Sequence, residues 1–325
     1  MDALKGAAIL LVVIGHALEG LLASQFNYYL YSVIYSFHMP LFVFLAGLHA
    51  KSSLTERDAS NIVKRIVLPF IVFQVAYTQY VHFVPGWVYG PLQPYWILWF
   101  LVSLFAWRLL LPVFASPTGL MVAAVMGIAA GSFPQIGGDF SLSRTFYFFP
   151  FFIFGSIYGF DLLQSIDRHR KWAWCWLAAA IVGVTVWTHY GLNPITLRGS
   201  EPYLTYRAFK NEPEMGRALV WLVALMGIVG FCAIVPRKSK PLEYLGKNVF
   251  AIYLFHGFLI MAFKNYLAPM VGSGMAGLLI VLVGTVGICF ALAPLQKHME
   301  RGFNGLYRLM DKVSITLTPK HRQRG

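Results

Sequence analysis

Apolar residues occur along this 325-residue chain in long blocks separated by short polar stretches. A helix needs roughly 20 consecutive apolar residues to cross the hydrocarbon core of a bilayer. We identify ten blocks near that length, at residues 5–22, 29–50, 66–84, 95–114, 118–133, 145–163, 172–189, 217–235, 249–268 and 274–294. The fifth is the shortest. The pattern therefore predicts an all-α integral membrane protein, a bundle of about ten transmembrane helices.

Composition supports this interpretation, because 58% of the residues are hydrophobic and only 12% are charged. Soluble domains rarely show that balance. The chain opens directly into an apolar block without a small-residue cleavage site, so we expect no cleavable signal peptide. Cys175, Cys232 and Cys289 lie far apart in apolar blocks, where buried, unreactive thiols are expected. Because His and Cys form no zinc-type cluster, the sequence predicts no metal site.

The positions of Lys and Arg predict an orientation. With the N-terminus in the cytoplasm, the inside segments and the tail hold eighteen, namely Lys51, Arg57, Lys64, Arg65, Arg168, Arg170, Lys171, Arg237, Lys238, Lys240, Lys247, Lys297, Arg301, Arg308, Lys312, Lys320, Arg322 and Arg324. The outside segments hold six, namely Arg144, Arg198, Arg207, Lys210, Arg217 and Lys264. This bias predicts cytoplasmic N- and C-termini. We expect the protein to lie in the cytoplasmic (inner) membrane. The bias also means that the net charge of +13 follows membrane orientation, and we expect no nucleic-acid partner.

The chain divides into a membrane domain, residues 1–296, and a basic cytoplasmic tail, residues 297–325. The tail is partly amphipathic, because apolar residues recur among basic ones at helical spacing: Phe303, Leu306, Leu309, Met310 and Val313. The longest outside loop, residues 191–217, is either functional or a simple connector. We find no internal repeat, which gives no support to an inverted-repeat transporter.

One stripe of the first predicted helix carries unusual chemistry. Lys5 and His16 are eleven residues apart, which returns to nearly the same helix face roughly 16 Å further along the axis. Asp2 and Glu19 stand three residues from them and are possible partners. His16 is either a hydrogen-bonded structural residue or a general base in a cavity; ionisable groups in a bilayer usually face a cavity or a pathway. Glu19 would orient His16, or would simply be solvated near the outer interface.

Other candidates lie on neighbouring blocks. His38 stands just before Pro40, which is expected to kink its helix, and is either a packing residue at the kink or part of the same outer cavity as His16. His256 is either a structural histidine or a substrate-binding one. Arg144 would face a sugar or extend to the interface.

Lys64 and Arg65 form a basic pair at the cytoplasmic end of the third block. Such a pair usually serves orientation, but with Lys5 it would also clamp the phosphates of an anionic donor. Among motifs of soluble enzymes, no H-x3-D, H-x4-D, G-x-S-x-G or Walker pattern is present in the chain.

Six segments in order resemble the acyltransferase-3 superfamily of membrane O-acyltransferases, in its fucose 4-O-acetylase-like branch. They are DALKGAAILLVVIGH, SFHMPLFVFLAG, KRIVLPF, YWILWFLVSLF, FPFFIFG and LGKNVFAIYLFHGF. The basic residue and the His of the family signature would be Lys5 and His16, and its basic pair would be Lys64 and Arg65, imperfectly matched. Many members carry Arg where Lys5 stands, and members normally have several residues before this motif.

The resemblance implies transfer of an acyl group, usually acetyl, from cytosolic acyl-CoA to a hydroxyl of an envelope or exported glycan or glycolipid. Acetyl-CoA would be the donor, with a carbohydrate or glycolipid acceptor and membrane lipids as the other partners. His16 would act as general base or as an acyl relay, with Glu19 beside it. The alternative is a glycan or lipid transporter or flippase without acyl chemistry, which also needs polar groups inside the membrane.

Overall fold

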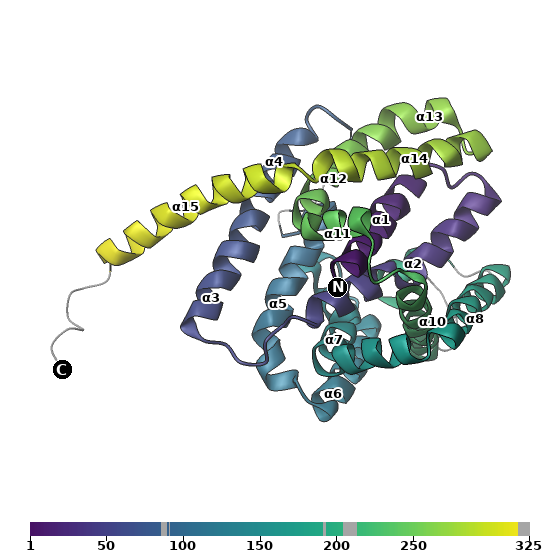
Figure 1. The fold of residues 1–325 in the computed structure, drawn as a ribbon, viewed down its shortest axis with the longest axis horizontal. Helices are drawn as coiled ribbons and strands as arrows, with labels where there is room; N and C mark the ends of the chain where they lie inside the picture. The colour runs from purple at the N-terminus through teal and green to yellow at the C-terminus, as the bar shows by residue number, and fades with distance from the viewer. Residues whose placement is uncertain (86–89, 91, 191–192, 204–212, 318–325) are drawn as a thin grey trace.

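The computed structural model describes residues 1–85, 90, 92–190, 193–203 and 213–317 (Figure 1). The described part contains helices and no strand, as predicted. In chain order they are α1 (Asp2–Leu18), α2 (Gln25–Gly47), α3 (Glu56–Ile62), η1 (Val63–Val67), α4 (Leu68–Tyr80), η2 (Trp96–Leu98), α5 (Trp99–Phe114), α6 (Pro117–Ala129), η3 (Ala130–Ser132), η4 (Asp139–Ser141), α7 (Leu142–Arg168), α8 (Arg170–His189), η5 (Pro194–Arg198), α10 (Pro213–Ile234), α11 (Lys240–Lys247), α12 (Val249–Ala262), η6 (Phe263–Leu267), α13 (Ala268–Val271), α14 (Met275–Leu292) and α15 (Leu295–Leu317).

All ten predicted blocks are helical, and eight helical stretches among the described residues are long and apolar enough to cross a membrane. The first and fifth blocks form shorter helices, the 17-residue α1 and the apolar stretch Pro117–Ser132. The structure therefore confirms an all-α membrane protein, and crossings by these two shorter helices stay a prediction. α2 is continuous through Pro40.

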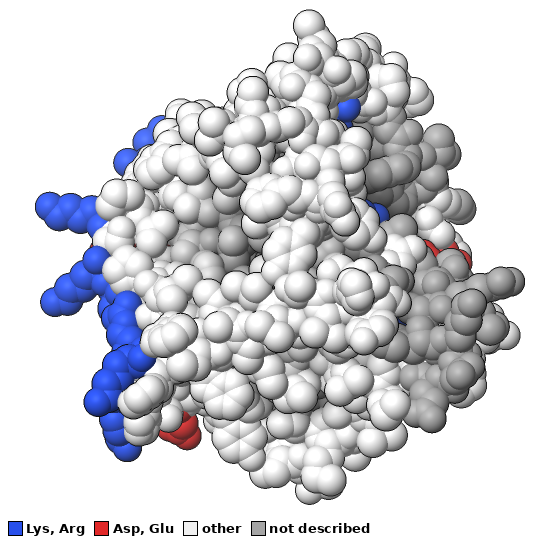
Figure 2. All heavy atoms as spheres, turned by 90° about the vertical axis from the view of Figure 1, so that its right-hand side faces the viewer, with Lys and Arg blue, Asp and Glu red and all other residues white. Residues whose placement is uncertain are grey.

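Charged side chains are distributed unevenly over the surface. Figure 2 shows Lys and Arg gathered along one edge of the molecule, while the middle of that face is almost bare of charge among the described residues. A broad uncharged band suits the hydrocarbon core of a bilayer. Which end faces the cytoplasm stays a prediction. Cys175, expected to be buried, is instead exposed on α8, while Cys232 and Cys289 are buried.

Helix α1 lies in the centre of the bundle, where it packs against α2, α11, α12 and α14 (Figure 1). Small residues allow the closest of these approaches. An added Cβ at Gly6 would lie 1.9 Å from the Leu242 carbonyl oxygen of α11, and one at Gly246 would lie 1.9 Å from the Asp2 carbonyl oxygen of α1. Two reciprocal glycines thus fix α1 against α11.

Two glycines of α7 also allow close packing, in this case against α2. A Cβ at Gly155 would lie 2.1 Å from the Phe44 carbonyl oxygen, and one at Gly159 would lie 2.8 Å from the Leu48 side chain. α15 leaves the bundle and projects away from it (Figure 1). In its described part, Phe303 and Tyr307 stack with ring centroids 6.0 Å apart.

Replacement of Gly6 by alanine is expected to destabilise the protein by about 1–3 kcal/mol, because the new methyl group must push α11 backbone away from α1. The measurement is thermal unfolding in detergent. Gly284→Ala on α14 is the matched control, since nothing lies within 4 Å of a Cβ there. Equal unfolding temperatures for the two variants would show that the α1–α11 contact is not tight.

Candidate functional site

His16 is held by a carboxylate and a tyrosine at the end of α1. Its Nδ1 lies 3.2 Å from Glu19 Oε1 and 3.0 Å from the Tyr35 hydroxyl of α2, and that hydroxyl also donates to Glu19 Oε1. With Nδ1–H donated to Glu19, the lone pair of Nε2 is left free to accept a proton. The Glu19 side chain is only 6% exposed, so it is not a solvated residue. The contacts at Nδ1 therefore fix the orientation of the imidazole ring.

Two cations also contact the Glu19 carboxylate. Lys264 Nζ lies 2.7 Å from Oε2, and Arg198 Nη2 lies 3.6 Å from Oε1. Lys264 stands on the π-helical turn η6 and lies over the Trp96 ring, 5.2 Å from its centroid. Neither cation was predicted from the sequence as a site residue. A lysine inside the apolar block 249–268 is itself the signal that could have found Lys264, because charges within the membrane are usually functional.

His38 and His256 lie next to this centre. The His256 ring stacks on His16 at 5.6 Å between centroids, and the His38 ring lies 4.4 Å from that of Tyr35. Nδ1 of each is within hydrogen-bonding distance of a backbone carbonyl one turn earlier, Ile34 at 2.9 Å for His38 and Ile252 at 3.1 Å for His256. Because a carbonyl oxygen accepts, Nδ1 is the donor, which makes Nε2 an acceptor in the neutral ring. Both Nε2 atoms are buried without a partner among the described residues. Two fixed acceptors of this kind suit hydroxyl or amide groups of a ligand.

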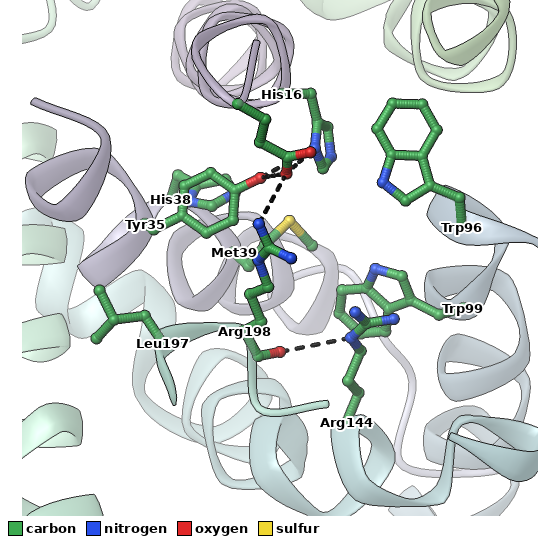
Figure 3. Close-up of a pocket in the computed structure, with 10 residues that line it drawn as sticks. His16, Tyr35, His38, Met39, Trp96, Trp99, Arg144, Leu197 and Arg198 are labelled. Carbon is green, nitrogen blue, oxygen red and sulfur yellow. Dashed lines mark hydrogen bonds and ion pairs between the residues drawn. The ribbon is translucent and has the colours of Figure 1, made fainter. Parts of the chain in front are cut away.

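A cavity of about 140 Å³, which we name the outer cavity after its predicted side of the membrane, opens beside His16 (Figure 3). Its polar and aromatic lining comprises His16, Glu19, Tyr35, His38, Trp96, Trp99, Arg144 and Arg198. Trp96 packs edge-on against His16 at 4.9 Å, from a backbone whose φ of 26° is unusual for a bulky residue. Such strain is commonly found at functional sites.

The described segment 193–203 closes one side of this cavity, through Leu197 and Arg198. Arg198 donates from Nε to the Tyr31 hydroxyl at 2.9 Å, and Arg144 Nε lies 3.4 Å from the Arg198 carbonyl oxygen and over the Trp99 ring. Burial raises the pKa of the nearby Glu201 carboxyl, and the charge of Arg144 acts in the opposite direction. The loop predicted at 191–217 therefore contributes side chains to the site from its described part; residues 191–192 and 204–212 lie outside the described residues.

A second cavity, of about 270 Å³, which we name the basic cavity, lies at the Lys5 end of α1. Its walls are apolar, but Lys5, Arg65 and His49 also line it. Lys5 pairs with Asp2 at 3.5 Å, as its spacing predicted. His49, interpreted from the sequence as a solvated residue, is exposed as expected and stands at the edge of this cavity, and Lys64 is not among the lining residues.

A narrow void of about 10 Å³ lies between the two cavities. It shares Phe42, Phe100 and Tyr253 with the basic cavity. It shares His16, Met39 and Trp99 with the outer cavity, and His256 also lines it. The three spaces therefore form a row along α1, with His16 where the void meets the outer cavity.

The structure thus gathers most of the predicted site residues. His16, Glu19, His38 and Arg144 line the outer cavity, His256 the void, and Lys5 and Arg65 the basic cavity. No group of three or more His, Cys, Asp or Glu within the described ranges is placed to hold a metal ion. The residues that sequence analysis did not select are Tyr35, Trp96, Trp99, Arg198, Lys264 and His49.

Comparison with known proteins assigns the family. Residues 1–294 match the family model described as acyltransferase domain, Acyl_transf_3. Glucans biosynthesis protein C of Salmonella paratyphi B and of Salmonella agona are each 24% identical to this chain over 196 residues, which cover 57% of this chain and 48% of each relative. The match thus spans about half the length of these curated relatives. No solved structure matches the chain. Because the family model covers most of its length, the chain belongs to the acyltransferase-3 family of membrane acyltransferases.

Proposed function

We propose that this protein is an O-acyltransferase of the cytoplasmic (inner) membrane that moves an acyl group, acetyl in the first instance, from cytosolic acyl-CoA to a hydroxyl of an envelope or exported glycan or glycolipid. The observation that carries the proposal is the row of spaces along α1. A basic cavity and an aromatic, polar cavity meet at one histidine through a narrow void. Two substrates approaching from opposite ends would meet at His16.

The basic cavity suits the donor. Lys5 and Arg65 supply positive charge for phosphates, and the apolar walls suit the uncharged pantetheine arm. The roughly 16 Å between Lys5 and His16 along α1 is comparable to an extended arm of this kind. Lys64 does not line this cavity, so we assign the phosphate contacts to Lys5 and Arg65, with His49 beside them.

The outer cavity suits a sugar. Tryptophan rings such as Trp96 and Trp99 offer flat apolar faces, while Arg144 and the acceptor nitrogen of His38 offer polar contacts. The name of the Salmonella relatives, glucans biosynthesis protein C, is in keeping with a glycan acceptor. Placement in the fucose 4-O-acetylase-like branch stays a prediction.

The proposed chemistry uses His16 as general base. Its Nε2 takes the proton of the acceptor hydroxyl, the oxygen attacks the thioester carbonyl, the acyl carbon–sulfur bond breaks, and the proton is returned to the departing thiolate of CoA. Glu19 holds the imidazole through Nδ1 and stabilises the imidazolium. A covalent acyl-His16 relay gives the same products in two steps.

The alternative of a flippase without acyl chemistry explains the polar groups. It does not explain why a basic cavity and a cavity suited to a sugar meet at a histidine whose ring is oriented by a carboxylate. A direct test is the O-acetyl content of envelope glycans in cells with and without the protein. Purified protein that binds no acyl-CoA, and cells whose glycan acylation is unchanged, would favour the flippase.

Replacing Lys5 and Arg65 with glutamine, singly, is expected to raise the KM for acetyl-CoA by about tenfold each, since each variant loses one charge-assisted phosphate contact. The kcat should change little. Arg57→Gln is the matched control, because Arg57 is exposed on the same helical stretch and does not line the cavity. An equal KM for Arg57→Gln and Arg65→Gln would place the phosphates elsewhere.

A further inference from the structure

The void between the two cavities is far smaller than either neighbour, about 10 Å³ against about 270 Å³ and 140 Å³. A space of this size holds roughly one water-sized group. His16 lines both the void and the outer cavity, so a group in the void lies beside the base. Anything that reaches His16 from the basic cavity must pass or enter this space.

Val12 and Ile97 form the wall that belongs to the void alone. Both line it, and neither lines the basic or the outer cavity. They are 4% and 2% exposed, so they are packed in place. The remaining lining residues are either shared with one of the two cavities or, in the case of His256, polar.

The backbone fixes both wall residues relative to His16. Val12 precedes His16 by four residues on α1, so it lies on the same face one turn away. The backbone of Ile97, in η2, accepts a hydrogen bond from the Tyr253 hydroxyl at 2.7 Å, which ties this wall to α12. A wall held from two helices and a short 3₁₀ turn resists widening.

We propose that the acyl tail binds in the void and that Val12 and Ile97 determine the acyl length that the enzyme accepts. This inference rests on the proposed function. When the thioester sulfur stands where the basic cavity meets the void, the acyl group leads into the void and lies beside His16. A single methyl group, the tail of acetyl, fits there, and each further methylene must displace Val12 or Ile97.

The consequence is selection by size. In an apolar pocket, one methylene too many changes the preference between two ligands by roughly 10–200-fold. Propionyl and butyryl donors are therefore expected to bind progressively more weakly than acetyl, even though their coenzyme portion and its phosphate contacts are identical. Truncation of either wall residue opens space in the one direction that these longer tails need.

The experiment measures the dissociation constants of CoA, acetyl-CoA, propionyl-CoA and butyryl-CoA for the purified full-length protein in lipid nanodiscs. For the wild type, butyryl-CoA is expected to bind at least about tenfold more weakly than acetyl-CoA. For Val12→Ala and Ile97→Ala, the ratio should fall to about threefold or less. Val13→Ala is the matched control: Val13 is adjacent, fully buried and lines none of the three spaces, so its ratio should equal the wild-type ratio.

The outcomes separate the two proposals. If no CoA compound binds the wild type, the proposed function fails. If CoA and acetyl-CoA bind but butyryl-CoA binds equally well, or if Val12→Ala and Ile97→Ala leave the ratio unchanged, the donor site stands and the length-setting role is overturned. Should one alanine variant not fold, the other and the wild-type series decide between these results.

Discussion

Replacing His16 with glutamine is expected to reduce acyl transfer by about 10²–10⁴-fold while leaving the affinity for acyl-CoA nearly unchanged. Glutamine can keep a hydrogen bond to Glu19, but it cannot take the proton of an acceptor hydroxyl. The measurement is incorporation of label from radioactive acetyl-CoA into envelope glycan, in membranes that contain equal amounts of folded protein. A loss of turnover without a loss of donor binding is the signature of a general base.

The control for this substitution is His298→Gln. His298 is exposed on α15 and lines none of the three spaces along α1, so its activity should match the wild type. Near-normal transfer by a folded His16→Gln variant would end the assignment of His16 as base or relay. The buried acceptor nitrogen of His256, on the ring stacked at 5.6 Å, would then be the next candidate.

Replacing Glu19 with glutamine is expected to be severe for both stability and activity. The carboxylate is the shared partner of Lys264 at 2.7 Å and Arg198 at 3.6 Å, and it is almost fully buried. Removing one side of a buried ion pair leaves uncompensated charge and typically destabilises by about 3–5 kcal/mol. Thermal unfolding in detergent should show a clearly lower midpoint, and acyl transfer should be lost with the orientation of His16.

A second variant separates these two effects. In Glu19→Gln with Lys264→Met, the partly buried lysine charge is removed together with its partner, so much of the stability should return while transfer stays low. Asp167→Asn is the matched control, because Asp167 makes an ion pair of the same 2.7 Å length with Arg237, with a half-exposed carboxylate. Exposed pairs contribute about 0–1 kcal/mol. If Glu19→Gln were no worse than Asp167→Asn, Glu19 would have neither role.

Much of this architecture follows from hydrophobic block length. All ten blocks are helical, because the backbone of an apolar segment in a membrane must satisfy its own hydrogen bonds, and a helix does so. The eleven-residue spacing of Lys5 and His16 also predicted their arrangement, since helix geometry fixes how two positions on one helix relate. Lys5 and His16 do line two different cavities along the same helix.

Contacts between helices were harder to predict from the sequence. Tyr35, Trp96 and Lys264 meet His16 and Glu19 from three other parts of the chain, and no spacing rule links residues of separate helices. Two of these positions also depart from regular helix geometry, since Lys264 stands on a π-helical turn and Trp96 has a positive φ. Local patterns assume regular geometry, so they misplace side chains where the backbone deviates.

The two residue pairs Lys5–Asp2 and His16–Glu19 show where a pattern can and cannot decide a role. Both were predicted from the same three-residue spacing, and both form. Only the second became a buried centre, because α2 and η6 cover it, whereas the Lys5 and Asp2 side chains remain 29% and 37% exposed. Burial, which depends on neighbouring helices, distinguishes a site from a solvated pair.

The position of both cavities on one continuous helix has an energetic consequence for the proposed reaction. A transporter must expose its site first to one side of the membrane and then to the other. Here α1, fixed by its glycine contact with α11, would present the donor and the acceptor to each other without such a cycle. The polyanionic coenzyme would stay at one membrane surface and the glycan at the other, and only a small uncharged acyl group would have to pass the barrier between them.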